Sequence, residues 1–426
     1  MSESKNAIIY LFSGTGNTLI AAEKTAKALA GNGIQTDLYR IVTKDSGLYK
    51  TAFFKAGENG SLLACCAEDK ADHPVFLSEE FGLVPDPNSY DIAGFAYPIH
   101  AFNAPQFFLR FVKKLPKLDP EKQGMPAFLF KTSGEPFKPN ASSSVTLNQF
   151  LRKKGFAPGI DLHMLMPYNI MFRYPKAMAK QMYLHTDEMC EFLAGQVAEG
   201  SFQPLHYNLF LNLFAYILRI QWFGAWINGP MHSANKSLCV GCGICANTCP
   251  TNNIRMISKT LAASALTEPV SSGRETERMR PKFGWKCTMC MNCTMGCPKA
   301  AINPGFLTPW KVNPKWDFPA LLADESIPSN WTDSPKAKYF KFFRKYYKKY
   351  SFEDYVIDLT EELFQNENQL QQQVPVMETE ESLLFDVDTL SGTDLFSEEV
   401  PSDNVLFSED EAYSEENESG PGFSHP

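Results

Sequence analysis

Eight cysteines carry the clearest chemical signal in the sequence. The stretches CVGCGICANTCP and CTMCMNCTMGCP share the spacing C-x2-C-x2-C-x3-C-P. Ile254 and Ile302 fall at the same offset from the first cysteine of each run, so the two runs form an internal duplication. They use eight of the eleven cysteines, and no histidine stands at metal-ligand spacing. The sequence therefore predicts two matched sets of thiolate ligands.

The spacing also predicts how the eight thiolates divide between two 4Fe–4S clusters. Three closely spaced cysteines converge on one cubane, whereas the fourth, followed by proline, reaches the other cluster. The predicted ligand sets are Cys239, Cys242, Cys245 and Cys297 for one cluster, and Cys287, Cys290, Cys293 and Cys249 for the second. Zinc is the competing interpretation, but structural zinc sites use pairs of cysteines rather than three in tandem. Cys65, Cys66 and Cys190 are expected to be idle thiols.

A second candidate site lies near the N-terminus, between an apolar run at 7–12 and the helical pattern TLIAAEKTAKALAGNG. Its residues are Ser13, Gly14, Thr15, Gly16, Asn17 and Thr18. Glycines, hydroxyls and free N–H groups at a helix start predict a phosphate cradle. The lysine of a P-loop and the third glycine of a dinucleotide-binding loop are both missing. A turn that binds nothing is the alternative.

The string SGTGNT resembles the FMN-phosphate loop of flavodoxins, and the chain after it resembles their strand–helix repeats. YDIAGFAYPIHAFNAPQFFLRFV is predicted to hold a third strand, at 92–97, then a loop and a helix. MPAFLFKTSGEP and DLHMLMPYN are predicted to be the fourth and fifth strands. This order predicts an α/β fold with a flavodoxin-like doubly wound parallel sheet, which binds ligands outside the carboxyl ends of its strands.

The resemblance to flavodoxins further implies that the loops at 97–103 and 132–135 enclose the isoalloxazine ring of FMN. The implied contacts are Tyr97, Pro98, Phe102, Asn103, Thr132, Ser133 and Gly134. Tyr97 and Phe102 are the candidate ring-stacking residues, and ordinary core packing is the alternative for each.

The combined pattern resembles the flavodoxin–ferredoxin fusion proteins of anaerobes, called the EFR type, over about residues 6–304. YPIHAFNAP, MPYN and GWKCTMC all fit it. The resemblance implies an FMN domain at 5–200 and a small α+β two-cluster ferredoxin domain at 233–304. Compact bacterial ferredoxins have a shorter connection than the 37 residues between Cys249 and Cys287. An insertion is expected there, as a cluster shield, a docking surface or a plain surface loop.

Charge divides the chain into a basic body and an acidic tail. Residues 351–426 hold 21 Asp and Glu but no Lys or Arg, so residues 1–350 carry +13 within the overall net charge of −8. The tail has the composition of a disordered segment. It repeats Leu-Phe ahead of acids (ELFQNE, LLFDVD, DLFSEE, VLFSED), which is typical of binding segments, although a merely solubilising tail is the alternative.

Two further segments are candidates for peripheral membrane contact. LFLNLFAYILRIQWFGAWI, at 209–227 within a hydrophobic helical bridge at 201–232, is interrupted by Asn212, Arg219 and Gln221. We expect a helix packed on the two domains first, an interfacial helix second, and a membrane span last.

The other segment, KAKYFKFFRKYYKKY at 336–350, belongs to a basic aromatic extension at 305–350. Helical spacing places four bases on one face: Lys341, Arg344, Lys345 and Lys348. Aromatic residues line the opposite face. This pattern suits an anionic membrane surface. Packing on the ferredoxin domain is the alternative, and no nucleic-acid partner is expected.

Three redox centres imply electron transfer. We expect an electron-transfer protein that exchanges electrons with an external ferredoxin or another redox protein. One alternative is a flavin-dependent reductase of a small organic substrate, with His100, Asn103 and Glu135 beside the flavin. Another is a redox-sensing interaction protein that works through its tail. The N-terminus shows no export signal, so a reducing cytoplasm is expected.

Overall fold

The computed structural model describes residues 5–57, 60–65, 74–168, 170, 173–207, 209–261, 276–308, 312–333 and 341–349, all within one compact unit. The predictions for the acidic tail at 351–426 and for Cys66 lie outside the described residues.

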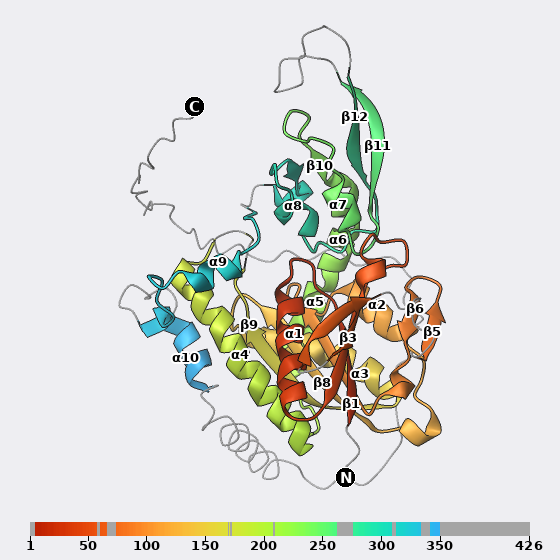
Figure 1. Cartoon of the computed structure of the whole chain (residues 1–426), viewed down its shortest axis with the longest axis vertical. Helices are drawn as coiled ribbons and strands as arrows, with labels where there is room; N and C mark the ends of the chain where they lie inside the picture. Colours follow the sequence, from red (N-terminus) through yellow and green to blue (C-terminus); the bar gives the residue numbers. More distant parts are fainter. Residues whose placement is uncertain are drawn as a thin grey trace, which may run out of the picture. The chain divides into compact units, whose positions relative to one another are not determined.

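A seven-stranded sheet forms the first domain, in the order β4-β3-β2-β1-β7-β8-β9 (Figure 1). Its parallel strands are β1 (Asn6–Leu11), β2 (Gln35–Arg40), β7 (Ile92–Pro98), β8 (Met125–Ser133) and β9 (Phe156–Leu165). Numbered among themselves, these strands have the order 2-1-3-4-5, which is that of the flavodoxin-like doubly wound sheet. The predicted fold class is confirmed.

The irregular segment after β2 adds two antiparallel strands to this sheet, β3 (Phe53–Ala56) and β4 (Leu62–Cys65). Beyond them β5 (Val75–Ser78) and β6 (Gly82–Pro85) form a separate hairpin. Neither pair is among the elements predicted from the sequence.

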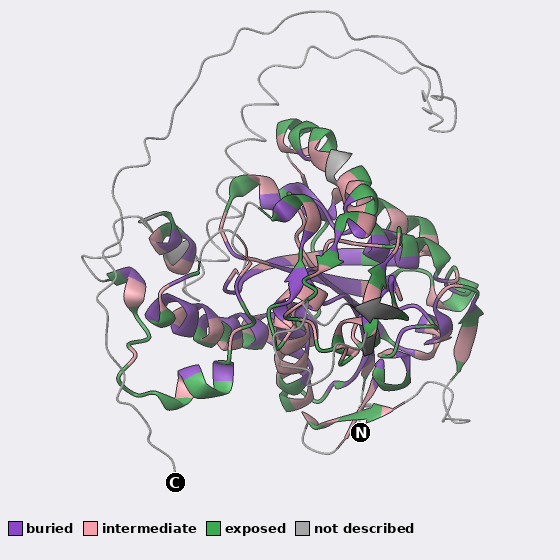
Figure 2. Ribbon diagram, turned by 90° about the horizontal axis from the view of Figure 1, so that it is seen from above, coloured by how far each residue is buried: buried purple, intermediate pink, exposed green. Residues whose placement is uncertain are grey.

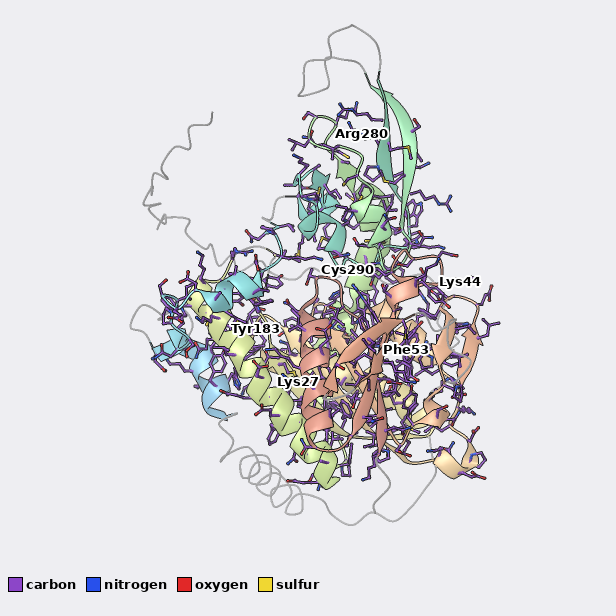
Figure 3. All side chains as sticks on the ribbon, in the orientation of Figure 1. Lys27, Lys44, Phe53, Tyr183, Arg280 and Cys290 are labelled. Atoms are coloured by element: carbon purple, nitrogen blue, oxygen red, sulfur yellow. The ribbon has the colours of Figure 1, made fainter. Side chains whose placement is uncertain are left out.

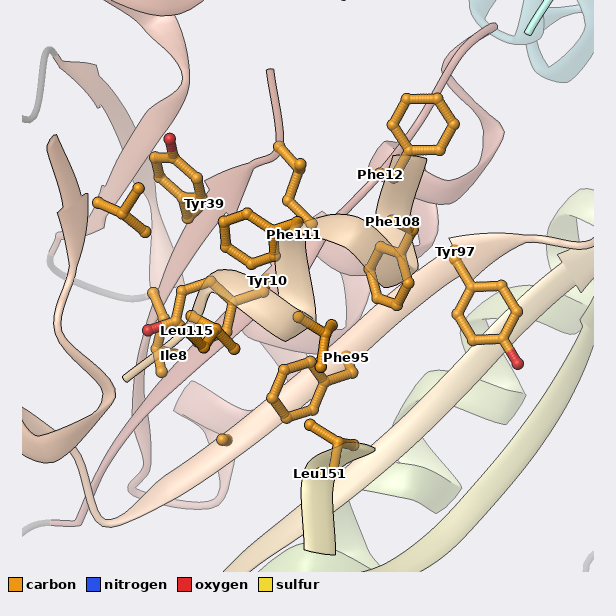
Figure 4. Close-up of a cluster of buried hydrophobic side chains, with 14 of the residues drawn as sticks. Ile8, Tyr10, Phe12, Tyr39, Phe95, Tyr97, Phe108, Phe111, Leu115 and Leu151 are labelled. Carbon is orange, nitrogen blue, oxygen red and sulfur yellow. The ribbon is translucent and has the colours of Figure 1, made fainter. Parts of the chain in front are cut away.

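Helices cover both faces of the sheet. On one face, α1 (Asn17–Gly31) and α4 (Lys176–Glu199) bury aliphatic residues against β1. On the other, α2 (Gln106–Lys114) and α3 (Val145–Lys154) bury an aromatic cluster that includes Tyr10, Phe95 and Phe111 (Figure 4). Alternate residues of β1 point into these two cores, as the period of a strand requires. The central strands are buried along most of their length (Figure 2).

The predicted ferredoxin domain is built from two strand pairs and two short helices. β10 (Ser233–Ala234) pairs with β13 (Ile302–Asn303), and β11 (Ile254–Leu261) pairs with β12 (Thr276–Phe283). α7 (Ile244–Asn247) and α8 (Asn292–Met295) each lie inside one cysteine run. Ile254 and Ile302, the matched residues of the duplication, pack in one core. The predicted insertion is the β11–β12 hairpin, whose middle, 262–275, is outside the described residues.

The segment between the domains forms α5 (Leu209–Ile217), a 3-10 turn η7 (Leu218–Ile220) and α6 (Gln221–Met231). By length and composition, 209–231 is the one described segment that is long and apolar enough to cross a membrane. Only 6% of its most apolar 18-residue stretch is buried. Our first expectation, a helix packed on both domains, is therefore wrong for most of its apolar side chains.

The C-terminal extension contains α9 (Phe318–Ala323) and α10 (Lys341–Lys349). Phe343 and Tyr346 of α10 are buried against Tyr174, Met178 and Met182. The aromatic face thus packs on the flavodoxin-like domain. The alternative prediction, packing on the ferredoxin domain, is wrong about the partner.

Short 3-10 helices complete the described elements: η1 (Tyr49–Thr51), η4 (Pro87–Ser89), η5 (Pro120–Lys122), η6 (Lys138–Ser144), η9 (Gly305–Leu307) and η10 (Trp331–Asp333).

Candidate cofactor sites

The eight cysteines surround two separate cavities. A cavity of about 20 Å³ is lined by Cys239, Cys242, Cys245 and Cys297. A second, also of about 20 Å³, is lined by Cys249, Cys287, Cys290 and Cys293. The structure thus groups the thiols in the two sets that the spacing predicts, each with its fourth cysteine from the other run. The hairpin closes the first cavity with Met256 and Pro281, which agrees with a shielding role for the insertion.

Backbone geometry bends each run around its cavity. Gly241 and Gly243 have positive φ angles of 76° and 74°. Met289 and Met291 occupy the equivalent positions of the second run, with φ angles of 52° and 55°. A side chain makes this conformation costly, so the backbone of the second run is strained at these two positions. The first run avoids that strain because it has glycine there.

The thiol environments fit a cluster in each cavity. Burial raises the pKa of Cys290 to about 12 and that of Cys287 to about 11, so thiolates there need a compensating positive charge. Backbone N–H groups donate to sulfur at 3.3 Å, from Met289 to Cys287 and from Ala301 to Cys297. Such donors tune cluster potentials.

Over the described ranges, no three or more His, Cys, Asp or Glu side chains gather tightly enough to hold a single metal ion. Each set of four thiols instead surrounds a space, as the ligands of a multi-atom cluster do.

A third cavity, of about 420 Å³, opens at the carboxyl ends of β1, β7 and β8. It is within the range of small-molecule sites. Ten of the thirteen predicted FMN contacts line it: Ser13, Gly14, Thr15, Asn17, Thr18, Pro98, Phe102, Thr132, Ser133 and Gly134. Gly16 is not in the wall, but its φ of 113° makes the turn into α1.

Local hydrogen bonds hold the two predicted FMN loops together. Thr18 Oγ1 lies 2.8 Å from Thr132 Oγ1, which joins the start of α1 to the end of β8. Asn17 Nδ2 donates to Pro167 O at 3.0 Å, and an Arg40 guanidinium N–H donates to Ser13 O at 3.2 Å. The loop shape is therefore fixed by contacts from three directions.

Two predicted contacts are placed elsewhere. Tyr97 is fully buried, with its OH 2.7 Å from Ser144 Oγ and its ring 5.1 Å from that of Phe108 (Figure 4). The ring-stacking hypothesis for Tyr97 is wrong, because strand alternation turns this side chain into the core. The Asn103 side chain is also buried, and its Nδ2 donates to Ala215 O at 2.7 Å, so it anchors α5 instead of lining the cavity.

Phe102 keeps its candidate role, because its ring lines the cavity. It adopts a left-handed backbone with φ of 62°, and its ring lies 5.6 Å from that of Phe214. Tyr168 is a lining residue that our predictions missed, although MPYN placed it just after the fifth strand.

Two titratable groups also line this cavity. Burial raises the pKa of Glu135, against a smaller lowering from the Tyr174 OH, which donates to Oε1 at 3.3 Å. Burial lowers the pKa of His100 to about 4, so its imidazole is neutral at pH 7.

The third cavity meets the second cysteine cavity at Cys290, which lines both. Figure 3 labels this residue. The two domains also share hydrogen bonds nearby. Ser46 Oγ donates to Cys249 O at 2.8 Å, and Thr43 N donates to Pro250 O at 2.9 Å. One thiol thus separates the two candidate sites.

Residues 238–301 match the family model of the 4Fe-4S dicluster domain. The chain therefore joins a flavodoxin-like sheet to a 4Fe-4S dicluster domain, the two parts of a flavodoxin–ferredoxin fusion. Electron transfer by redox cofactors is the general activity of such a pairing.

Solved structures similar to the fusion protein include a flavodoxin of Streptococcus pneumoniae, at 15% identity, covering 45% of this chain and 99% of that one, with a TM-score of 0.27. A WrbA-like flavodoxin of Agrobacterium tumefaciens has 14% identity, covers 46% and 99%, and scores 0.26. A flavoprotein of Lactobacillus acidophilus in complex with FMN has 15% identity, covers 37% and 93%, and scores 0.23. The strand order, not these low scores, establishes the fold. No curated protein sequence matches the fusion protein significantly.

Proposed function

We propose that the fusion protein transfers electrons between FMN, two 4Fe–4S clusters and an external ferredoxin or other redox protein. FMN would occupy the third cavity, and the two predicted cysteine sets would each hold one cluster. The observation that carries the proposal is the position of Cys290, which lines both the flavin cavity and a cysteine cavity.

The residues of the third cavity fit FMN. The start of α1 offers backbone N–H groups and the hydroxyls of Ser13, Thr15 and Thr18 to a phosphate. Phe102 offers an aromatic face to a planar ring. When bound, FMN accepts one or two electrons and each cluster accepts one, whereas the protein supplies position and environment.

The two cysteine sets differ in exposure, which suggests separate tasks. Cys242 of the first set is exposed, and so are its apolar neighbours Leu238, Val240 and Ile244. In the second set, Cys290 lines the third cavity. We therefore assign the first set to contact with an external redox protein, and the second to exchange with the flavin. A reducing cytoplasm would keep all eight thiols available for iron.

Anaerobic purification of the full chain, followed by flavin, iron and sulfide analysis, tests this proposal. We expect FMN together with about eight iron atoms for each chain, as two 4Fe–4S clusters require. Protein that takes up iron but no FMN under any condition would overturn it.

A second candidate function is reduction of a small organic molecule at the flavin. The observation that favours it is the pair of polar groups in the cavity, since Glu135 and His100 both line it and have shifted pKa values. Reoxidation of the reduced flavin by a member of a metabolite panel would support this function. Reoxidation by redox proteins alone would leave electron transfer as the function.

A further inference from the structure

The helix pair α5–α6 exposes an unusual number of large apolar side chains. Phe210 is 82% exposed, Leu209 76% and Phe223 71%. The same segment exposes Leu213, Phe214, Tyr216, Ile217, Trp226, Ile227 and Met231. A continuous apolar surface of this kind marks an interaction site, because water solvates it poorly. We propose that α5–α6 lies in the surface of an anionic lipid bilayer, with this apolar side among the acyl chains.

The single charge of the segment is turned inward. Arg219 is the one charged residue in 209–231. Its guanidinium donates to Asn103 Oδ1 at 3.5 Å and to the Thr146 hydroxyl, and lies over the rings of Tyr216 and Trp222. Arg219 is thus held by the flavodoxin-like domain, and the exposed side of the helices carries apolar groups without a charge.

Anchors at two points make the pair lie along a bilayer instead of crossing it. Asn103 Nδ2 donates to Ala215 O, and the fully buried Asn228 donates to Pro304 O at 3.1 Å. A spanning segment would have to break both contacts. The helices hold 9 and 11 residues, or about 14 and 17 Å, and the turn η7 separates them.

Composition and charge favour a lipid surface over a second copy of the chain. Tyr216 and Trp226 have an apolar body and a polar tip, which suits the level of the headgroups. Exposed bases flank the pair, with Lys138 on η6, which α5 packs against, and Lys286 beside Trp285, whose ring lies 4.7 Å from that of Trp226. Anionic headgroups attract such bases, whereas a second copy would bring like charges together.

Cosedimentation of the full-length holoprotein with vesicles tests the proposal. We expect binding to vesicles of phosphatidylcholine with phosphatidylserine, and weaker binding to phosphatidylcholine alone. The variant Leu213→Glu/Ile217→Glu/Phe223→Glu should bind at least tenfold more weakly. A matched control, Leu63→Glu/Leu77→Glu, changes two leucines that are 65% and 78% exposed on β4 and β5, and it should bind like the wild type. Unchanged circular dichroism and iron content establish that both variants fold.

The remaining outcomes also decide. Release of the bound protein by alkaline carbonate supports an interfacial helix pair, and resistance to carbonate overturns it in favour of a span. The proposal is overturned if the wild type does not bind anionic vesicles. It is also overturned if the triple variant binds them as well as the control does. A wild-type dimer in lipid-free solution that the triple substitution dissociates overturns it too, because the second copy would then be the occupant.

Discussion

Gly14 and Cys290 lie so close that a Cβ on Gly14 would be 2.5 Å from Cys290 Cβ and 2.7 Å from Cys290 O. The glycine of the candidate phosphate loop thus contacts a cysteine of the second ligand set directly. The absence of a side chain at position 14 is what lets the two domains meet there.

We predict that Gly14→Ala separates this contact. The added methyl group meets backbone and Cβ atoms that cannot rotate away, which costs about 1–3 kcal/mol as overpacking. Unfolding by denaturant should show the loss of stability, and fluorescence titration should show weaker FMN binding. Gly31→Ala is the matched control, because its Cβ would meet nothing within 4 Å, and it should leave both quantities intact.

Loss of one thiol should remove one cluster. We expect Cys242→Ser to lower the iron content from about eight to about four atoms for each chain. The reason is that Cys242 lines the first cavity and not the second. Cys65→Ser changes a cysteine outside both cavities and should keep full iron. Equal iron loss in both variants would contradict the assignment of the two sets.

At position 289, glycine should give the more stable fold than alanine, whereas the native methionine should give the tighter FMN binding. With φ of 52° and a side chain in the wall of the third cavity, it combines backbone strain with a position in the candidate FMN site. Met289→Gly should be about 1 kcal/mol more stable than Met289→Ala, the reverse of the usual order. Both variants should bind FMN more weakly than the wild type. Thermal unfolding and flavin titration measure the two effects, and an alanine variant more stable than the glycine variant would refute the strain.

The sequence predicted the parts of this fold that follow from local pattern. The apolar run at 92–97 became β7, and the cysteine spacing anticipated both thiol groupings. Side-chain direction was harder to foresee. Tyr97 and Phe102 looked equivalent in YPIHAF, but the first still follows strand alternation into the core, whereas the second has left the strand.

The bridge and the extension show the same limit. Apolar residues at 209–227 and aromatic residues at 336–350 looked alike as candidates for packing. The structure buries Phe343 and Tyr346 of α10 against α4 but leaves Phe210 and Phe223 exposed, on the side of α5 and α6 that faces away from their contacts with the two domains. Which face meets which partner depends on tertiary contacts that periodicity does not contain.

A half-buried histidine, His163, should make stability depend on pH. Burial, with a smaller effect of Lys131, lowers the pKa of His163 to about 3, and its Nε2 lies 2.7 Å from Ser133 Oγ. The unfolded chain therefore binds a proton between about pH 6.5 and 3 that the folded protein does not. The free energy of unfolding therefore falls as the pH is lowered below 6.5, by about 2 kcal/mol between pH 6.5 and 4.5. Above pH 6.5 His163 is neutral in both states, and the stability that it contributes is fully present.

The variant His163→Gln should flatten this part of the stability profile, as measured by urea unfolding at several pH values. His206→Gln changes an exposed histidine and should keep the slope of the wild type. A slope that His163→Gln leaves unchanged would show that other groups cause it.

The most direct test of the central claim is an anaerobic rapid-mixing experiment on the full chain. The oxidised holoprotein is mixed with a one-electron donor, and the absorbance of the clusters and of the flavin is followed together. Because Cys290 lines both sites, we predict that electrons reach the flavin within one chain, at a rate independent of protein concentration. A flavin that stays oxidised while the clusters are reduced, or a rate proportional to protein concentration, would contradict the account.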